Sequence, residues 1–292
     1  MKKKIGIVTD SAIGISLEEL KKYPELTVVP LVIIDDNNKI YEDNNLDITG
    51  DGIYQAMIVD EHVLKTSQTN RERLREYWQD VLKKYEQILF LPIAQAASGQ
   101  YDSACILQQE PEFKDRVVVY ETGAASVPLK TMALIALQLS NEKKNGIKEI
   151  TKALDQFRLG YQCFLTPSNL TYLARGGRIP SSLSYLANFL KLKAVISCKE
   201  KIKSHKIKRT MNHAIKEMLE TIIEKTKNVF QQTLYVLNAW CDQDLLDKAI
   251  AKAQELGFKK IKIEPLCNIL QTHTGNNTIG FAVIKNKYKI EP

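Results

Sequence analysis

The first half of the chain alternates short apolar runs with amphipathic segments, and this alternation limits the fold more than any other feature. The apolar runs have the length of buried strands and lie at 4–9, 27–34, 87–91 and 116–120. Helices are expected between them at 53–59, 70–85 and 128–139. Strands separated by helices favour a parallel sheet covered on both faces. We therefore expect an α/β fold that begins with a three-layer α/β/α domain and a mostly parallel sheet.

The second half has a different pattern. Residues 194–198 and 201–208 are typical of a β-hairpin, which requires antiparallel pairing. Further strands are expected at 162–165, 233–238, 260–264 and 279–284, and helices at 168–175, 210–226 and 242–256. This order predicts an α+β domain with a mixed sheet. Because 292 residues are long for one domain, we expect two, covering residues 1–160 and 161–292.

Several classes of protein are disfavoured by what the sequence lacks. No apolar run reaches 18 residues, so we expect no membrane span. The basic start leads directly into a strand, unlike a signal peptide. The five cysteines are scattered without a CxxC pair, which favours reduced thiols and a cytoplasmic location. There is no GxGxxG, P-loop or HExxH motif, so we expect neither a cofactor nor a metal.

The formal charge of +7 has one local concentration, at Lys199–Arg209. Three interpretations stay open for this stretch: a solvated hairpin face, a docking surface for an acidic partner protein, and a nucleic-acid patch. The stretch contains no aromatic residue, which argues against nucleic acid as a partner.

Hydroxyl side chains gather where the expected strands end. They lie in the loops around Thr9 and Ser11, Thr66 and Ser67, Ser98, and Thr122 and Ser126. Because the carboxyl ends of parallel strands share one edge of a sheet, these loops should lie together. Hydroxyls beside the free N–H groups of a helix N-terminus favour an anion. Each hydroxyl alone is also explained as a helix cap, but together they predict a site for a small anionic group.

Two polar stretches of the second half are further candidates. Arg178 follows a pair of glycines, and His273 lies between two threonines ahead of Gly275, in what we interpret as a polar loop. A triad of Ser98, His273 and Asp10 would make a serine hydrolase acting on small esters, and this alternative stays open. Ser98 does not lie in a GxSxG elbow, and the sequence alone does not bring the three residues together.

The chain resembles the DegV family over essentially its whole length. The matching stretches follow in order along the sequence: IGIVTDSAIGIS at the start, VVPLVI after it, LKTSQ at 64–68, FLPIAQAASGQYDSA at 90–104, YLARGGRI at 172–179, LKAVIS at 192–197 and THTGNNTIGFA at 272–282. As an ordered set these stretches are specific to the family.

The resemblance implies two α/β domains with one long-chain fatty acid between them. Some members of the family are similar to the fatty-acid-binding subunit of a bacterial fatty acid kinase, in which a separate ATP-using subunit phosphorylates the bound carboxylate. The resemblance therefore implies a carrier and not an enzyme. It also implies that this carrier uses no cofactor, binds no nucleic acid and makes at most transient contact with a membrane surface.

The resemblance also assigns roles to residues. By position in the motifs, Thr66 and Ser98 would hold the carboxylate. The residues expected to surround the head group or the incoming phosphate are Arg178, His273, Gly99 and Ser126. Arg209 would lie near the contact with the kinase.

The chain departs from the family pattern at three places: Thr69 stands where many relatives have proline, Glu121-Thr122 replaces Asp-Ser, and His213 replaces a basic residue.

Overall fold

Four parallel strands form the sheet of the N-terminal domain, in the order β2-β1-β6-β7. The computed structural model describes residues 3–142, 144–179, 190–199 and 201–285, so Glu200 of the basic stretch lies outside them. The strands are β1 (Lys3–Asp10), β2 (Leu26–Val29), β6 (Tyr85–Leu91) and β7 (Val117–Val119). The expected parallel sheet is confirmed.

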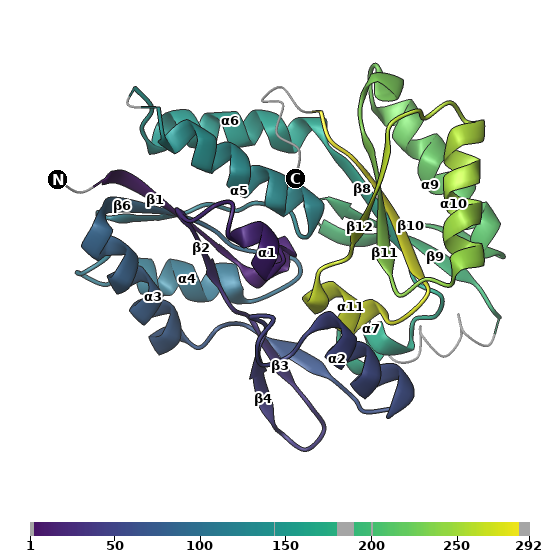
Figure 1. Ribbon diagram of the computed structural model, residues 1–292, viewed down its shortest axis with the longest axis horizontal. Helices are drawn as coiled ribbons and strands as arrows, with labels where there is room; N and C mark the ends of the chain where they lie inside the picture. Colours follow the sequence, from purple (N-terminus) through teal and green to yellow (C-terminus); the bar gives the residue numbers. More distant parts are fainter. Residues whose placement is uncertain (1–2, 143, 180–189, 200, 286–292) are drawn as a thin grey trace.

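Helices cover both faces of this sheet (Figure 1). One face carries α3 (Arg71–Lys84) and α4 (Gln100–Gln108), and the other carries α5 (Val127–Ser140) and α6 (Ile147–Gly160). Alternate residues of β1 supply the two faces, because side chains of a strand point to opposite sides. Ile5 and Ile7 belong to the apolar cluster that includes α5, whereas Val8 packs with Trp78 of α3.

The strand is interrupted at Pro30, where we expected one continuous strand. Pro30 has no N–H to donate to the sheet, and the run divides there into β2 and β3 (Val32–Ile34). β3 leaves the parallel sheet and forms a small antiparallel sheet with β4 (Ile40–Glu42) and β5 (Lys65–Ser67). Between β4 and β5 the chain forms α2 (Gly50–Tyr54) and one wider π-helical stretch at Gln55–Val59. The short helices Ser11–Ile13 and α1 (Leu17–Leu20) follow β1.

The C-terminal domain is built on a mixed sheet of six strands, in the order β10-β9-β8-β13-β11-β12. The strands are β8 (Gln162–Thr166), β9 (Lys193–Lys199), β10 (Lys201–Lys208), β11 (Leu234–Ala239), β12 (Ile261–Pro265) and β13 (Thr278–Val283). The helices are α7 (Thr171–Arg175), α9 (Met211–Lys225), α10 (Gln243–Glu255) and α11 (Asn268–Thr274), with a 3₁₀ turn at Val229–Gln231. Only β11 and β12 run parallel, so the expected mixed sheet is confirmed.

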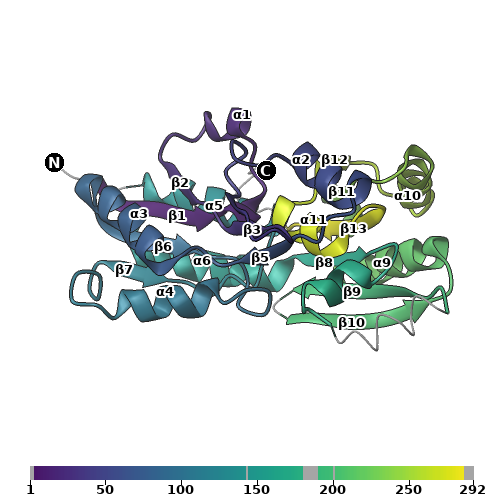
Figure 2. The ribbon, with the colours of Figure 1, turned by 90° about the horizontal axis from the view of Figure 1, so that it is seen from below.

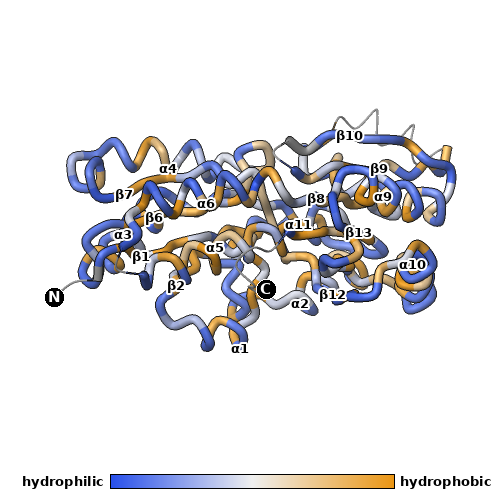
Figure 3. Tube along the Cα trace, turned by 90° about the horizontal axis from the view of Figure 1, so that it is seen from above, coloured by the Kyte–Doolittle hydropathy of each residue, from blue (hydrophilic) through white to orange (hydrophobic). Residues whose placement is uncertain are grey.

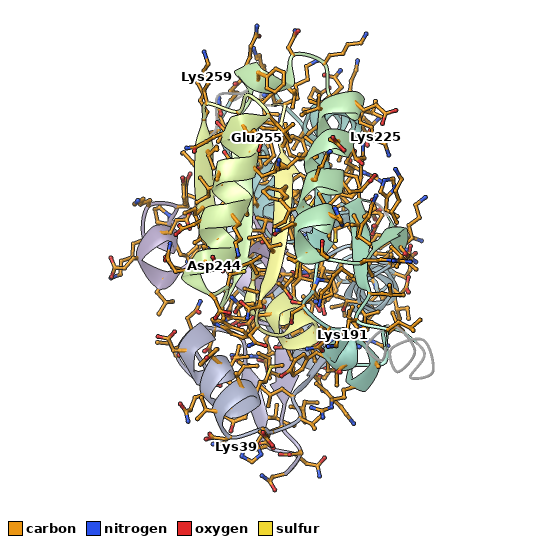
Figure 4. The ribbon with its side chains drawn as sticks, turned by 90° about the vertical axis from the view of Figure 1, so that its right-hand side faces the viewer. Lys39, Lys191, Lys225, Asp244, Glu255 and Lys259 are labelled. Atoms are coloured by element: carbon orange, nitrogen blue, oxygen red, sulfur yellow. The ribbon has the colours of Figure 1, made fainter. Side chains whose placement is uncertain are left out.

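The two faces of this second sheet have different neighbours. α9 and α10 lie side by side on the outer face, with Asp244 and Glu255 near the two ends of α10 (Figure 4). Their apolar residues form one cluster with Phe164, Val236 and Phe281. The opposite face, which includes Leu165 and Leu237, belongs to the same apolar cluster as α5 and α6 of the N-terminal domain. The two domains therefore share a core.

Helix α5 lies at the centre of this shared core and is apolar along most of its length (Figure 3). Every residue from Val127 to Leu137 is buried, because the helix has β1 on one side and α6 on another. Figure 2 shows the two domains side by side, with α11 between them. Within the described part of the chain, no helix is both long and apolar enough to cross a membrane.

Candidate functional site

Thr66 lies on the short strand β5, where the sequence predicted a loop. Its hydroxyl oxygen is 2.6 Å from Nε2 of His273, which is on α11. β5 holds Thr66 in place by pairing with Ile33 of β3. The structure thus joins two of the predicted site residues by a direct hydrogen bond between the domains.

His273 is a helical and buried residue, and our interpretation of the surrounding stretch as a polar loop is wrong. It lies in the last turn of α11, and only 5% of its surface is exposed. The polar side chains fit within the helix, because Thr272 and Thr274 donate their hydroxyls to the carbonyl oxygens four residues earlier, at 2.9 Å each. Gly275, with a φ of +69°, ends the helix.

The imidazole of His273 stays neutral at physiological pH. Burial, and secondly the positive charge of Arg178, lower the pKa of His273 to about 3. Its Nδ1 atom has no hydrogen-bond partner among the described residues. A β-carbon placed on Gly176 would lie only 2.2 Å from Nδ1, so this glycine is the close neighbour of the ring.

Ser98 lies in the loop between β6 and α4, beside the loop that follows Thr66. The backbone N–H of Thr69 donates to the side-chain oxygen of Gln100 at 2.8 Å, which ties the two loops together. Gly99 packs against the side chain of Gln68, where a β-carbon would lie 2.5 Å from Oε1. The Ser98 hydroxyl accepts a hydrogen bond from the backbone N–H of Gln100 at 3.2 Å and remains half-buried. It can still donate its own proton.

Arg178 bridges the two sides of this group. Its guanidinium donates to the carbonyl oxygen of Gly176 at 2.5 Å and to that of Ala97 at 3.4 Å. Ala97 directly precedes Ser98, and Gly176 lies against His273. Partial burial lowers the pKa of Arg178 from its ordinary value, but a guanidinium keeps its charge in proteins. Thr66 on β5, His273 on α11 and the loops that carry Ser98 and Arg178 therefore adjoin one another.

The other two predicted residues lie in different surroundings. Ser126 is buried at the start of α5 with a φ of +54°, and its N–H donates to the carbonyl oxygen of Ala12 at 2.7 Å. Arg209 is exposed between β10 and α9. It lines a hollow of about 390 Å³ together with Lys208, His213 and Glu217.

Most of the other hydroxyls at strand ends serve the fold. Thr9, Thr69 and Thr122 each donate to a carbonyl oxygen of a neighbouring strand end at 2.7 Å. Ser11 accepts from the N–H of Leu31 at 3.0 Å. These contacts fasten the loops to one another. The hydroxyl of Thr66 instead contacts the other domain, at His273, and that of Ser98 accepts from the backbone N–H of Gln100.

The serine hydrolase alternative is not supported. Asp10 accepts from the N–H groups of Ala12 and Ile93, at 3.1 and 2.7 Å, and so fastens β1 to the loop after β6. Nε2 of His273 is bonded to Thr66 and not to Ser98. Within the described ranges, Ser98, His273 and Asp10 form no hydrogen-bonded triad. The described residues also contain no cluster of three or more ligating side chains for a metal.

Sequence reasoning missed three residues that shape this group. Gln68 and Gln100 connect the loops of Thr66 and Ser98. The ring of Tyr172 lies where a β-carbon on Gly275 would be, 2.2 Å from that position. Gln68 and Tyr172 both stand inside the stretches LKTSQ and YLARGGRI, so the motifs carried a signal for them.

Known proteins resemble this chain over nearly its whole length. A family model described as an uncharacterised protein of the DegV family matches residues 4–286. The chain belongs to the DegV family. The DegV domain-containing protein YqaC of Lactococcus lactis is 28% identical over 291 residues, which cover 97% of this chain and 100% of the relative.

Two further DegV relatives have names that describe a ligand. A protein of Thermotoga maritima named a fatty acid-binding protein is 24% identical, over 96% of this chain and 97% of its own. A solved structure from Thermus thermophilus, described as fatty acid binding of a DegV family protein, has a TM-score of 0.81 and 26% identity. It covers 96% of this chain and 99% of that chain. The expected DegV fold is confirmed.

Proposed function

We propose that this DegV protein binds one long-chain fatty acid between its two domains and presents the carboxylate to a separate ATP-dependent kinase subunit. The protein is then a cytoplasmic carrier and performs no chemistry of its own. The observation that carries the proposal is the contact between Thr66 and the neutral His273, beside Arg178 and the Ser98 loop. The names of the Thermotoga and Thermus relatives support a fatty acid as the ligand.

The state of His273 suits Thr66 for binding an anion. A neutral imidazole carries one proton, and we place it on Nε2, because Nε2 has the Thr66 oxygen as a partner whereas Nδ1 has none among the described residues. The proton is then on Nε2 and is donated to the Thr66 oxygen at 2.6 Å. This leaves the Thr66 hydroxyl proton free to be donated to a carboxylate oxygen.

Two neutral hydroxyls and one nearby cation are suited to hold a carboxylate that is to be phosphorylated while it is bound. Thr66 and Ser98 each donate one hydrogen bond, and Arg178 balances the charge. Arg178 already uses two of its five N–H groups on carbonyl oxygens, so it is less free than an unengaged guanidinium to clamp both carboxylate oxygens. One oxygen stays available for phosphoryl transfer, whose main requirement is positioning.

The acyl chain would lie in the apolar region that both domains contribute. Ile53, Met57 and Leu64, on the chain segment leading to Thr66, belong to the same cluster as Leu165 and Leu237 of the C-terminal sheet. Burial of each CH₂ contributes roughly 0.8 kcal/mol, so a sixteen-carbon chain gains on the order of 10 kcal/mol before association costs. The polar residues around Thr66 therefore contribute more to the position of the carboxylate and to selectivity than to affinity.

The basic hairpin is the proposed docking surface for the kinase subunit. Lys206 and Lys208 each lie 2.6 Å from Glu217 of α9. Burial alone would raise the pKa of Glu217, but these two ammonium groups lower it to about 2. The carboxylate neutralises part of the hairpin charge, while Arg209 and Lys203 stay exposed. Arg209 beside the hollow of about 390 Å³ favours an acidic partner.

The proposal is tested by extraction of the purified protein with organic solvent and mass spectrometry of the extract. We expect one long-chain fatty acid per chain, and we expect the delipidated protein to bind labelled palmitate or oleate. A bacterial fatty acid kinase subunit with ATP should then yield acyl phosphate on the carrier. If the extract holds no fatty acid and the delipidated protein binds neither probe, the proposed function is wrong.

A further inference from the structure

A second cavity, of about 640 Å³, lies on the other side of α11 from His273. It is enclosed by α1, the loop after β4, the start of α2 and the ends of β11 and β12, which meet beside α11 (Figure 1). His273 and Gln271 are two positions apart on α11, so their side chains point about 200° apart around the helix. Gln271 lines the cavity and His273 bonds to Thr66.

The floor of this cavity presents hydrogen-bond acceptors. Asp43 is 4% exposed and accepts from Nδ2 of Asn268 at 2.8 Å. Gln271 is also 4% exposed, and its Oε1 has no hydrogen-bond partner among the described residues. An unpartnered buried oxygen costs free energy unless a donor reaches it. Gln271 lines the cavity, so a ligand donor that reached this oxygen would remove that cost.

The charge of the cavity is negative. Its lining includes the carboxylates of Glu42, Asp43 and Asp51 and one cation, Arg73. Arg73 is already paired with Glu42 at 3.1 Å and with Glu76 at 2.9 Å. No lysine or arginine of the described ranges forms an ion pair with Asp43 or Asp51. Burial raises the pKa of Asp43 from its ordinary value, as expected for a carboxylate that lacks a counter-ion.

The rim of the cavity is apolar. Leu17 of α1 and Leu46 of the loop after β4 are both exposed there, at 38% and 75% of their surface. Trp240 also lines the cavity, and its ring meets that of Tyr54 edge to face with centroids 5.4 Å apart. Aromatic faces favour cations. The volume lies within the range of small-molecule sites.

We propose that this cavity binds a small organic cation, with an ammonium or guanidinium head on Asp43 and Gln271 and a short apolar body against Leu17, Leu46 and Trp240. The head donates to the free Oε1 of Gln271 and supplies the charge that Asp43 lacks. An acyl chain is a poor occupant, because its methylene groups would cover these acceptors without bonding them. This site is separate from the proposed lipid site and does not depend on it.

Calorimetric titration with three six-carbon probes tests the site: hexylammonium, hexan-1-ol and hexanoate. The protein is first saturated with palmitate, so that the probes do not bind at the proposed lipid site. The titrations are repeated with Thr66→Val, which removes a carboxylate contact of that site. We expect hexylammonium to bind once per chain and at least about tenfold more tightly than hexan-1-ol, and hexanoate not to bind.

Two variants locate the binding. Asp43→Asn keeps the shape of the side chain and should weaken hexylammonium binding about tenfold, and its folding is checked by thermal unfolding. Asp51→Asn changes an exposed residue, so it keeps the test valid if the first variant unfolds, and it should weaken binding by a smaller factor. Absence of saturable hexylammonium binding overturns the proposal, and so does equal binding of hexylammonium and hexan-1-ol or unchanged affinity in both variants.

Discussion

The Thr66 hydroxyl and Nε2 of His273 lie 2.6 Å apart, although 207 positions separate the two residues in the sequence. One belongs to the small sheet of the N-terminal half and the other to a helix of the C-terminal half. Any movement of one domain against the other changes this distance. The bond therefore couples the head-group residues to the arrangement of the domains.

Replacement of Thr66 by valine should reduce fixation of the fatty-acid carboxylate while the apolar region stays intact. We expect phosphorylation by the kinase subunit to fall about tenfold or more, because a hydrogen bond to a charged group contributes roughly 1.5–3 kcal/mol. Acyl phosphate formation and bound palmitate are measured on the same samples. Thr66→Ser keeps the hydroxyl and is the matched control. Equal phosphorylation of the valine and serine variants would contradict the assignment.

Stability should depend on pH through His273. The pKa of His273 is about 3 in the folded protein and 6.5 in the unfolded chain. Between these two pH values the imidazole is protonated in the unfolded chain and neutral in the folded protein. The free energy of unfolding should therefore decrease as pH falls from about 6.5 towards 3. The slope from this group is about 1.4 kcal/mol per pH unit.

Urea unfolding of wild type and His273→Asn between pH 4 and 7 measures this contribution. The free energy of unfolding of the variant should lack the pH dependence that comes from the uptake of this one proton. Burial raises the pKa of Asp10 to about 7. The pH dependence of its contribution has the opposite sign, because that contribution to stability is lost as pH rises from about 4 to 7. It is present in both proteins and cancels in the difference. Parallel pH profiles would show that His273 is protonated in the folded state.

Replacement of Gly176 by alanine should displace the ring of His273. The added β-carbon would lie 2.2 Å from Nδ1, well inside contact distance, and should break the bond to Thr66. We expect weaker palmitate binding and an altered His273 imidazole signal in the NMR spectrum. Gly52→Ala is the control, because its nearest atoms would lie at 3.5 Å. An unchanged His273 signal in Gly176→Ala would refute this packing.

Replacement of Lys130 by methionine should destabilise the protein strongly. The side chain of Lys130 is 3% exposed and lies 3.2 Å from both Glu19 of α1 and Glu264 of β12. Its loss leaves two partly buried carboxylates without a cation, which typically costs about 3–5 kcal/mol. Thermal unfolding measures the loss, and a second change, Glu264→Gln, should recover part of it. If the double variant is no more stable than the single one, the pair does not act through charge.

Replacement of Arg209 by glutamate should impair phosphorylation without loss of bound lipid. The change reverses a charge at the proposed docking surface, so it should reduce mainly the association rate with the kinase subunit. Lys259→Glu is the control, since Lys259 lies near the end of α9 that carries Lys225 (Figure 4), while Arg209 precedes the other end. Equal loss of phosphorylation in the two variants would mean that net charge matters and not a surface at Arg209.

Local patterns predicted the sheets and helices, but not where the chain changes direction. The alternation of the first half identified β1 and β6 as short apolar runs, and α3 by apolar residues at 3–4 spacing. The run at 27–34 is uniformly apolar, so nothing but Pro30 indicated that β3 leaves the sheet. Thr66 lies on a strand of three residues whose stability comes from pairing with β3, and a tertiary contact of this kind leaves no periodic signal.

The motifs predicted Thr66, Ser98, Arg178 and His273 as site residues, and the structure brings these four into adjoining segments. Their role in binding stays a prediction. The burial of His273 was missed because its threonine neighbours suggested exposure, whereas their hydroxyls are satisfied within α11. The hydroxyls of Thr9, Thr69 and Thr122 had the same sequence signature but bond to carbonyl oxygens, a difference that only the fold decides.

The apolar cluster that runs from α5 into the C-terminal sheet has a consequence for how the molecule unfolds. Because Leu165 and Leu237 complete the same core as Ile7 and Leu89, each half would expose the shared part of its interior if it stood alone, although each also has a cluster of its own. The two halves should therefore melt in a single cooperative transition, and a protease cut near residue 160 should leave a nicked complex that stays associated.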